Sequence, residues 1–135
     1  TPLPPPSAPV FLFPTAHHSC DLPYPAETGG ANGQSTPMVI LPYAIDSNDM
    51  KMWIDPAYTP AQWAQYAKDS FDWLVKEAQT EGARMMSLGL HLRIIGRPGR
   101  IGAFEDVLQH ITARDDVWVT TREAVAKHFA EHVPA

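Results

Sequence analysis

The strongest structural information in this chain lies in residues 85–100, which read Met85-Met86-Ser87-Leu88-Gly89-Leu90-His91-Leu92-Arg93-Ile94-Ile95-Gly96-Arg97-Pro98-Gly99-Arg100. Residues 84–92 are mostly apolar on both sides of the chain, which predicts a strand covered on each face, as in parallel sheets. Glycine and proline then predict a turn over 94–100, because they adopt the special backbone angles that turns require. His91 is therefore expected near the C-terminal end of a buried strand, just before a loop.

One helix is predicted before this strand in the sequence, and another after it. Thr59 is a good N-cap for a helix over 60–81, Gln62 completes a capping box, and Gly82 is typical of a helix end. Apolar residues recur through 60–81 at spacings of three and four, which gives the helix one apolar face. A second helix is predicted over 101–113 from the same kind of spacing.

Shorter elements complete the order. Met38–Leu41 is a short apolar run between two prolines and predicts a buried strand. Val117–Val119 predicts another short strand, and a capping box of Thr120 and Glu123 predicts the start of a last helix. Strands and helices therefore alternate, which predicts an α/β fold of parallel strands with crossover helices, either an open sheet or part of a barrel.

Composition limits the class of protein. The chain has 135 residues, about one domain, with 44% apolar and 19% charged residues, as in ordinary globular proteins. Fifteen acidic and ten basic residues without a basic cluster argue against a nucleic-acid partner. No apolar run is long enough to span a bilayer, and the single cysteine, Cys20, excludes an internal disulfide. We therefore expect a cytoplasmic protein that binds neither nucleic acid nor membrane.

The beginning of the chain differs in composition from the rest. Eight of the 14 prolines fall within the first 25 residues. Such a proline-rich segment favours extended, linker-like conformations. We therefore predict an irregular lead segment over 1–19 and one domain over 20–135.

His91 is the first candidate for a catalytic residue. In parallel α/β proteins, active sites form where the C-terminal ends of strands meet the following loops. A histidine there can act as an acid or a base. A core histidine that is hydrogen-bonded to a neighbouring carbonyl explains the same position equally well.

Other polar residues can approach the same edge of the sheet. Asn48 and Asp49 follow a predicted strand, but both are also ordinary turn residues. Arg97 lies in the loop after His91 and could bind a carboxylate, a ureide or a sugar oxygen. An arginine in a loop also serves solubility or surface salt bridges. From spacing alone, the ordinary roles are favoured for all three residues.

His128 and His132 share one face of the last predicted helix, because they are four residues apart. This is the spacing of two zinc ligands in a helical metal motif, but Phe129 stands where that motif has a glutamate. Solvent-exposed histidines are the simpler interpretation, so no metal site is predicted.

The 85–100 stretch closely resembles the C-terminal signature of the polysaccharide deacetylase superfamily (NodB-like), in its allantoinase-like and peptidoglycan-deacetylase-like branch. The resemblance covers about residues 20–134. It includes three further segments in the same order and spacing, Asp21-Leu22-Pro23-Tyr24, Leu41-Pro42-Tyr43 and Phe71-Asp72.

The resemblance implies a deformed (β/α) barrel, of which this chain is the C-terminal part. It also implies hydrolysis of non-peptide C–N bonds, such as N-acetyl groups on sugars or the cyclic amide of allantoin. Leu90-His91 match the last motif of the family, so His91 is implied as the general acid that protonates the leaving nitrogen. The implied substrate-binding residues are Arg97, Asp49, Asn48 and Asp21.

Some features depart from the family pattern. A barrel of this type needs roughly 200 residues, more than the 135 present. The family's N-terminal acidic motif and its metal-type His-x-x-x-His have no counterpart, and Cys20 precedes Asp21 where the branch has an acidic residue. We therefore expect no cofactor in this chain, and a divalent metal such as zinc only together with an N-terminal half.

Two functions are consistent with these observations. In the first, the chain is the C-terminal part of a hydrolase for a small amide, a ureide or an N-acetylated sugar, and is inactive until an N-terminal half complements it. In the second, it is a stand-alone, non-catalytic α/β domain that forms homo-oligomers through its open sheet edges. A metal-binding module using His128 and His132 is a third alternative, which zinc analysis of the purified protein tests.

Overall fold

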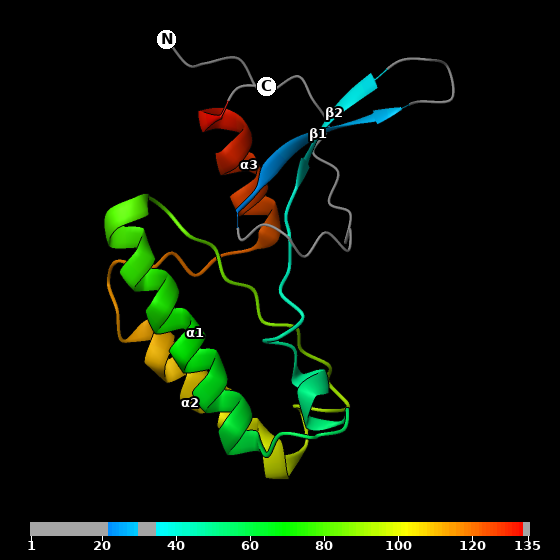
Figure 1. Ribbon diagram of the computed structural model, residues 1–135, viewed down its shortest axis with the longest axis vertical. Helices are drawn as coiled ribbons and strands as arrows, with labels where there is room; N and C mark the ends of the chain where they lie inside the picture. Colours follow the sequence, from blue (N-terminus) through cyan, green and yellow to red (C-terminus); the bar gives the residue numbers. More distant parts are fainter. Residues whose placement is uncertain (1–21, 30–34, 134–135) are drawn as a thin grey trace. The chain divides into compact units, whose positions relative to one another are not determined.

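The computed structural model describes residues 22–29 and 35–133. Along the chain these residues form β1 (Tyr24–Gly29), β2 (Ser35–Ile40), the 3-10 helix η1 (Asp49–Met52), α1 (Pro60–Glu81), α2 (Pro98–Thr112) and α3 (Arg122–His132) (Figure 1). They divide between two compact units. One unit covers Tyr43–Val119, and the other combines the described residues up to Pro42 with those from Thr120 to Val133. The predicted lead segment lies outside the described residues.

Helix α1 confirms the predicted helix at both ends. The hydroxyl of Thr59 accepts a hydrogen bond from the backbone N–H of Gln62 at 3.2 Å, and the side chain of Gln62 accepts one from the N–H of Thr59 at 2.9 Å. Gly82 ends the helix with a φ of 90°, which residues with a Cβ rarely adopt. The buried face of the helix consists of Trp63, Ala64, Ala67 and Phe71.

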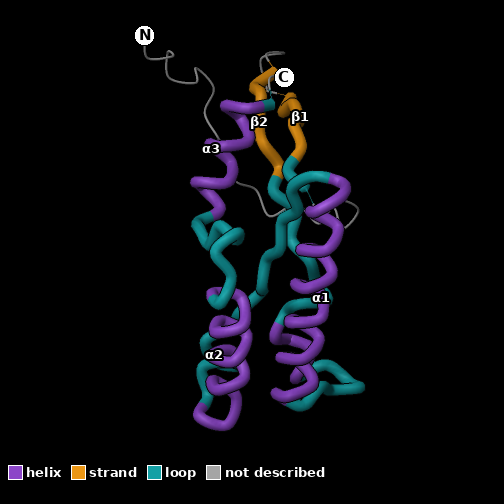
Figure 2. Tube along the Cα trace, turned by 90° about the vertical axis from the view of Figure 1, so that its left-hand side faces the viewer, coloured by secondary structure: helices purple, strands orange, loops and turns teal. Residues whose placement is uncertain are grey.

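Helix α2 lies alongside α1 (Figure 2), and the colours of Figure 1 show that both helices point in the same direction. Lys68 pairs with Asp106 at 2.7 Å, and Asp72 pairs with His110 at 2.8 Å. Both partners advance by four residues from one pair to the next, so the two helices run parallel. Parallel helices are expected in a crossover unit. In such a unit, an extended segment leads the chain from the end of the first helix back to the level at which that helix began, where the second helix starts.

That returning segment is extended, but the predicted strand over 84–92 is not part of a hydrogen-bonded sheet. The same holds for the predicted strand Val117–Val119. A strand needs a second extended segment beside it, and no such ladder forms within residues 43–119. Helix α2 then begins at Pro98, three residues before the predicted start, because proline is preorganised for the first helical position.

The core of this unit lies between α1, α2 and the turn after His91. Trp63, Ile94 and Val107 have no exposed surface. Met86 and Leu88 from the extended segment pack against the same cluster. Their alternation confirms that one side of 84–92 faces apolar residues, although no sheet forms there.

Strands β1 and β2 of the other unit are antiparallel, with Tyr24 opposite Ile40 and Ala26 opposite Met38. The predicted strand Met38–Leu41 therefore exists, but the predicted parallel arrangement is wrong for this sheet. Only residues 30–34 separate the two strands. So short a connection can join antiparallel strands but not parallel ones, which need a crossover.

Helix α3 begins one residue later than the predicted capping box. Its N-cap is Thr121, and the hydroxyl of this residue accepts a hydrogen bond from the N–H of Ala124 at 3.2 Å. Arg122 donates to the carbonyl of Leu41 at 2.6 Å, which attaches the start of α3 to the end of β2. No helix in the described part of the chain combines the length and apolar character needed to cross a membrane.

Candidate functional site

His91 and Asp49 form a hydrogen-bonded pair in the unit of residues 43–119. Nδ1 of His91 lies 2.6 Å from Oδ1 of Asp49, although the two residues are 42 positions apart in the sequence. The side chain of Asp49 has no exposed surface, whereas that of His91 is 37% exposed. The pair therefore places a buried carboxylate behind an imidazole that solvent can reach.

Three contacts hold the carboxylate of Asp49. Its Oδ2 accepts hydrogen bonds from the backbone N–H groups of His91, at 2.7 Å, and Ile95, at 3.2 Å. Its Oδ1 faces the imidazole. Burial of a carboxylate is costly unless its oxygens accept hydrogen bonds, and these contacts meet that requirement. One side chain therefore holds both the ring and the backbone of His91.

Two hydrogen bonds join the loop before Asp49 to the segment before His91. The N–H of Asp49 donates to the carbonyl of Gly89 at 2.9 Å, and the hydroxyl of Ser47 donates to the carbonyl of Ser87 at 2.7 Å. The bonded positions are two residues apart in both segments. This alignment places Asp49 beside His91.

Asn48 lies between these two hydrogen bonds and is only 7% exposed. Its side-chain oxygen accepts a hydrogen bond from the N–H of Met50 at 2.9 Å and so caps η1. A Cβ at position 89 would overlap the side-chain amide of Asn48. Glycine at 89 therefore leaves the space that this side chain fills.

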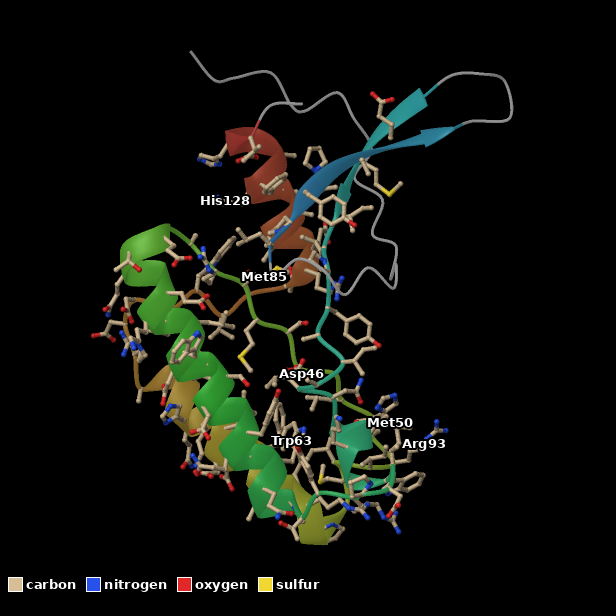
Figure 3. All side chains as sticks on the ribbon, in the orientation of Figure 1. Asp46, Met50, Trp63, Met85, Arg93 and His128 are labelled. Atoms are coloured by element: carbon tan, nitrogen blue, oxygen red, sulfur yellow. The ribbon has the colours of Figure 1, made fainter. Side chains whose placement is uncertain are left out.

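Trp63 connects the same loop to α1. Its indole N–H donates to the carbonyl of Ser47 at 3.3 Å, and the side chain has no exposed surface. Figure 3 shows Trp63 on the side of α1 that faces this loop. Sequence reasoning did not assign Ser47 or Trp63 to the site, because a serine in a turn and a tryptophan on an apolar helix face carry no functional signal.

Asp46 and Tyr66 form a further contact between the loop and α1, and we predict that it weakens at alkaline pH. The hydroxyl of Tyr66 donates to the carboxylate of Asp46 at 2.7 Å. This hydrogen bond, together with burial and the charge of Asp46, raises the pKa of Tyr66 above the ordinary value of 10.0. A pKa that is higher in the folded chain stabilises the fold below the unfolded pKa, and this contribution is lost as the pH rises through the folded pKa.

Urea unfolding between about pH 8 and about pH 11 measures this effect. We expect the free energy of unfolding to fall above about pH 10, and to fall less steeply in Tyr66→Phe, which lacks the titrating hydroxyl. Equal slopes in the two proteins would contradict the assignment to Tyr66.

The other two residues implied as substrate contacts are Arg97 and Asp21. Arg97 is exposed and is the N-cap residue of α2, without a hydrogen bond from its side chain to the cap. Asp21 lies outside the described residues.

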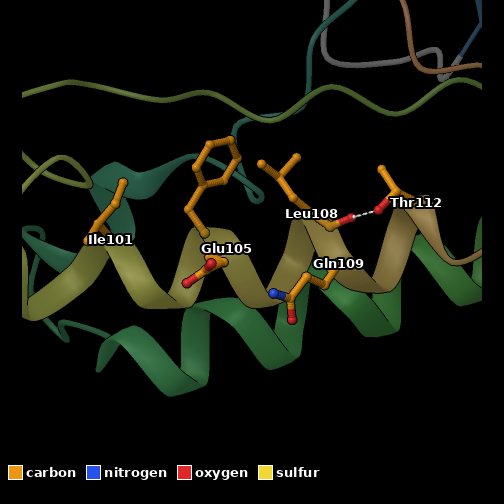
Figure 4. Close-up of a pocket in the computed structure, with 6 residues that line it drawn as sticks. Ile101, Glu105, Leu108, Gln109 and Thr112 are labelled. Atoms are coloured by element: carbon orange, nitrogen blue, oxygen red, sulfur yellow. Dashed lines mark hydrogen bonds between the residues drawn. The ribbon is translucent and has the colours of Figure 1, made fainter.

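A groove along the exposed face of α2 is separate from the His91–Asp49 pair. Neither residue of the pair lines it. Its walls are the side chains of Ile101, Phe104, Glu105, Leu108, Gln109 and Thr112 (Figure 4).

The pair does not fit a metal ligand set. The described residues include no group of three or more His, Cys, Asp or Glu side chains that could hold a metal ion. Both oxygens of Asp49 already accept hydrogen bonds from His91 and Ile95. What this arrangement offers is proton transfer, because the carboxylate fixes the orientation of the imidazole through Nδ1 while Nε2 remains for a reacting group.

The chain was compared with protein families, with curated proteins and with solved structures. No protein-family model matches the chain. A protein from Schizosaccharomyces pombe (strain 972), described as a polysaccharide deacetylase, is 38% identical over 98 residues, which are 72% of this chain and 31% of that protein.

Two crystal structures are also similar. A probable polysaccharide deacetylase from Pseudomonas aeruginosa PAO1 has a TM-score of 0.78 at 37% identity, and PuuE allantoinase has a TM-score of 0.78 at 33% identity. Each comparison covers 87% of this chain and 38% of the other chain.

The chain thus spans about a third of the length of these relatives. They are the kinds of protein that residues 85–100 resemble. Over most of its length, the chain is therefore similar to proteins of the polysaccharide deacetylase superfamily, including an allantoinase.

Proposed function

We propose that this chain supplies the general acid of a hydrolase that cleaves non-peptide carbon–nitrogen bonds. One observation carries the proposal, namely the contact of 2.6 Å between the half-exposed His91 and the fully buried Asp49. The names of the relatives, polysaccharide deacetylase and allantoinase, support this class of reaction.

In this proposal His91 protonates the nitrogen that leaves the substrate. Cleavage of an amide or ureide passes through a tetrahedral intermediate, and its nitrogen departs readily only after protonation. Asp49 accepts a hydrogen bond from Nδ1–H of His91, so Nε2–H of the imidazolium is the group that donates the proton. The negative charge of Asp49 stabilises the imidazolium before the transfer. Asp49 is thus a positioning residue, since its buried oxygens cannot reach a substrate.

Arg97 is the implied substrate contact that fits this role best. It is exposed and lies at the start of α2, six residues after His91. A guanidinium presents several donors to a ureide, carboxylate or sugar oxygen. Asn48 caps η1 inside the protein, and Asp21 stays a prediction from the family resemblance.

The rest of the catalytic site comes, in this proposal, from a complementing N-terminal half of a deformed (β/α) barrel. The chain spans about a third of the length of its relatives. Leu90 and Leu92, on either side of His91, are 38% and 90% exposed. A neighbouring strand would cover these side chains and pair with the extended segment 84–91. A divalent metal such as zinc would belong to that half.

The same exposed edge favours a second candidate function, a non-catalytic domain that self-associates. Another copy of the chain could cover Leu90 and Leu92 in place of the N-terminal half. The two candidates differ in whether complementation produces activity.

Co-expression with the N-terminal part of the Pseudomonas relative tests the proposal. We expect the complex to release acetate from an N-acetylglucosamine oligomer or to hydrolyse allantoin, and we expect His91→Ala to abolish this turnover with little loss of stability. His110→Ala is the matched control, because His110 also pairs with an aspartate and is also 37% exposed, but lies on α2. Turnover that survives His91→Ala would contradict the general-acid role. A homodimer in light scattering, without turnover in any complex, would favour self-association.

A further inference from the structure

Helix α3 carries two adjacent imidazoles on one face. His128 and His132 are four residues apart, about one helical turn. Their ring centroids are 4.2 Å apart, and the ring planes are inclined by 31°. Both side chains are exposed. The two rings therefore lie side by side on one face of α3.

A backbone hydrogen bond orients the second ring. Nδ1 of His132 lies 2.8 Å from the carbonyl oxygen of His128. A carbonyl can only accept, so Nδ1 of His132 carries the hydrogen and, in the neutral ring, Nε2 keeps its lone pair. Histidines that bind metals commonly have this arrangement, in which one nitrogen donates to a carbonyl and the other binds the ion.

We propose that His128 and His132 together bind one divalent transition-metal ion, with copper bound more tightly than nickel or zinc. Imidazole suits this group of ions, and the Irving–Williams order places Cu²⁺ first. Two nitrogens on one tetrahedral zinc ion lie about 3.3 Å apart, given Zn–N distances of about 2.0–2.1 Å. The ring centroids are 4.2 Å apart, and rotation of the two exposed side chains would turn both Nε2 atoms toward one ion.

The remaining coordination positions are open to water or to a ligand from outside the chain. The described residues provide no cluster of three or more metal-binding side chains, so the site is a two-imidazole site. It is independent of the proposed hydrolase function, because it involves neither His91 nor Asp49.

Isothermal titration calorimetry of the full chain with CuSO₄, and separately with ZnCl₂, tests the site. We expect one ion per chain, and the EPR spectrum of the copper form should show two equatorial nitrogens. His132→Ala and His128→Ala should each weaken binding about tenfold or more, because the second imidazole no longer acts at a high effective concentration. Each should leave one nitrogen signal. Zinc should raise the Tm of the original chain but not that of the double variant.

Glu131→Gln is the matched control, since Glu131 is the exposed acidic neighbour of His132 on the same helix. We expect it to bind both ions as tightly as the original chain does. Three results would overturn the proposal: no binding by the original chain, unchanged binding by the double variant, or a loss in Glu131→Gln as large as in His132→Ala. Circular dichroism must show the same helix content in every variant, and His132→Gln replaces His132→Ala if the latter loses helix.

Discussion

Replacing Asp49 with asparagine is expected to lower the kcat of the complemented enzyme by about a thousandfold to ten-thousandfold. The carboxylate now accepts from Nδ1 of His91 at 2.6 Å, in a position without exposed surface. An asparagine amide has no charge to stabilise the imidazolium, and its NH₂ group facing Nδ1 would favour the wrong tautomer. The proton that the leaving nitrogen needs would then be donated far less readily. Steady-state kinetics of allantoin hydrolysis or acetate release measures the loss.

Asp46→Asn is the control for this substitution. Asp46 lies in the same loop, but its carboxylate accepts from Tyr66 and does not contact His91. We expect this variant to keep most of the original kcat. Asp49→Asn should fold, because its side-chain oxygen can still accept from the N–H of His91 or Ile95, and circular dichroism checks this. If Asp49→Asn retained the original kcat and its pH profile, Asp49 would have no part in proton transfer.

Trp63→Ala is expected to lower the free energy of unfolding by about 3–5 kcal/mol, as large-to-small substitutions of buried aromatic residues do. Trp63 has no exposed surface and lies in the cluster with Ile94 and Val107. Its removal would leave a cavity between α1 and the turn after His91. It would also remove the hydrogen bond from the indole N–H to the carbonyl of Ser47, in the loop that carries Asp49. Urea unfolding followed by circular dichroism gives the value.

Trp73→Ala is the matched control on the same helix. Trp73 is 59% exposed, and its indole N–H donates to Glu77 on the surface of α1. We expect this variant to lose less than about 1 kcal/mol, because exposed side chains contribute little. Trp63→Phe keeps most of the packing but removes the indole N–H, so we expect a loss smaller than that of Trp63→Ala, with about 1 kcal/mol of it from the bond to Ser47. Similar losses from Trp63→Ala and Trp73→Ala would show that α1 does not bury its predicted face.

Features that depend on neighbouring residues could be predicted from the sequence. Both ends of α1 follow from Thr59, Gln62 and Gly82, because caps act within one helical turn. The position of His91 before a turn follows from Gly96 and Pro98 in the same way. The resemblance to polysaccharide deacetylases also follows from a local motif, residues 85–100, and the relatives confirm this resemblance.

Features that depend on distant residues required the folded chain. Asp49 has the sequence context of an ordinary turn residue, yet it lies buried against His91, 42 positions away. The alternation of residues 84–92 predicted a sheet, but whether a strand pairs depends on a second segment beside it. Here Ser47 and Asp49 bond the carbonyls of Ser87 and Gly89 in place of a strand. The spacing of residues in the sequence predicts helix ends and turns, because the interactions that form them are short-range. The spacing does not predict contacts between distant segments, because a hydrogen bond between two such segments forms only after the core has brought them together.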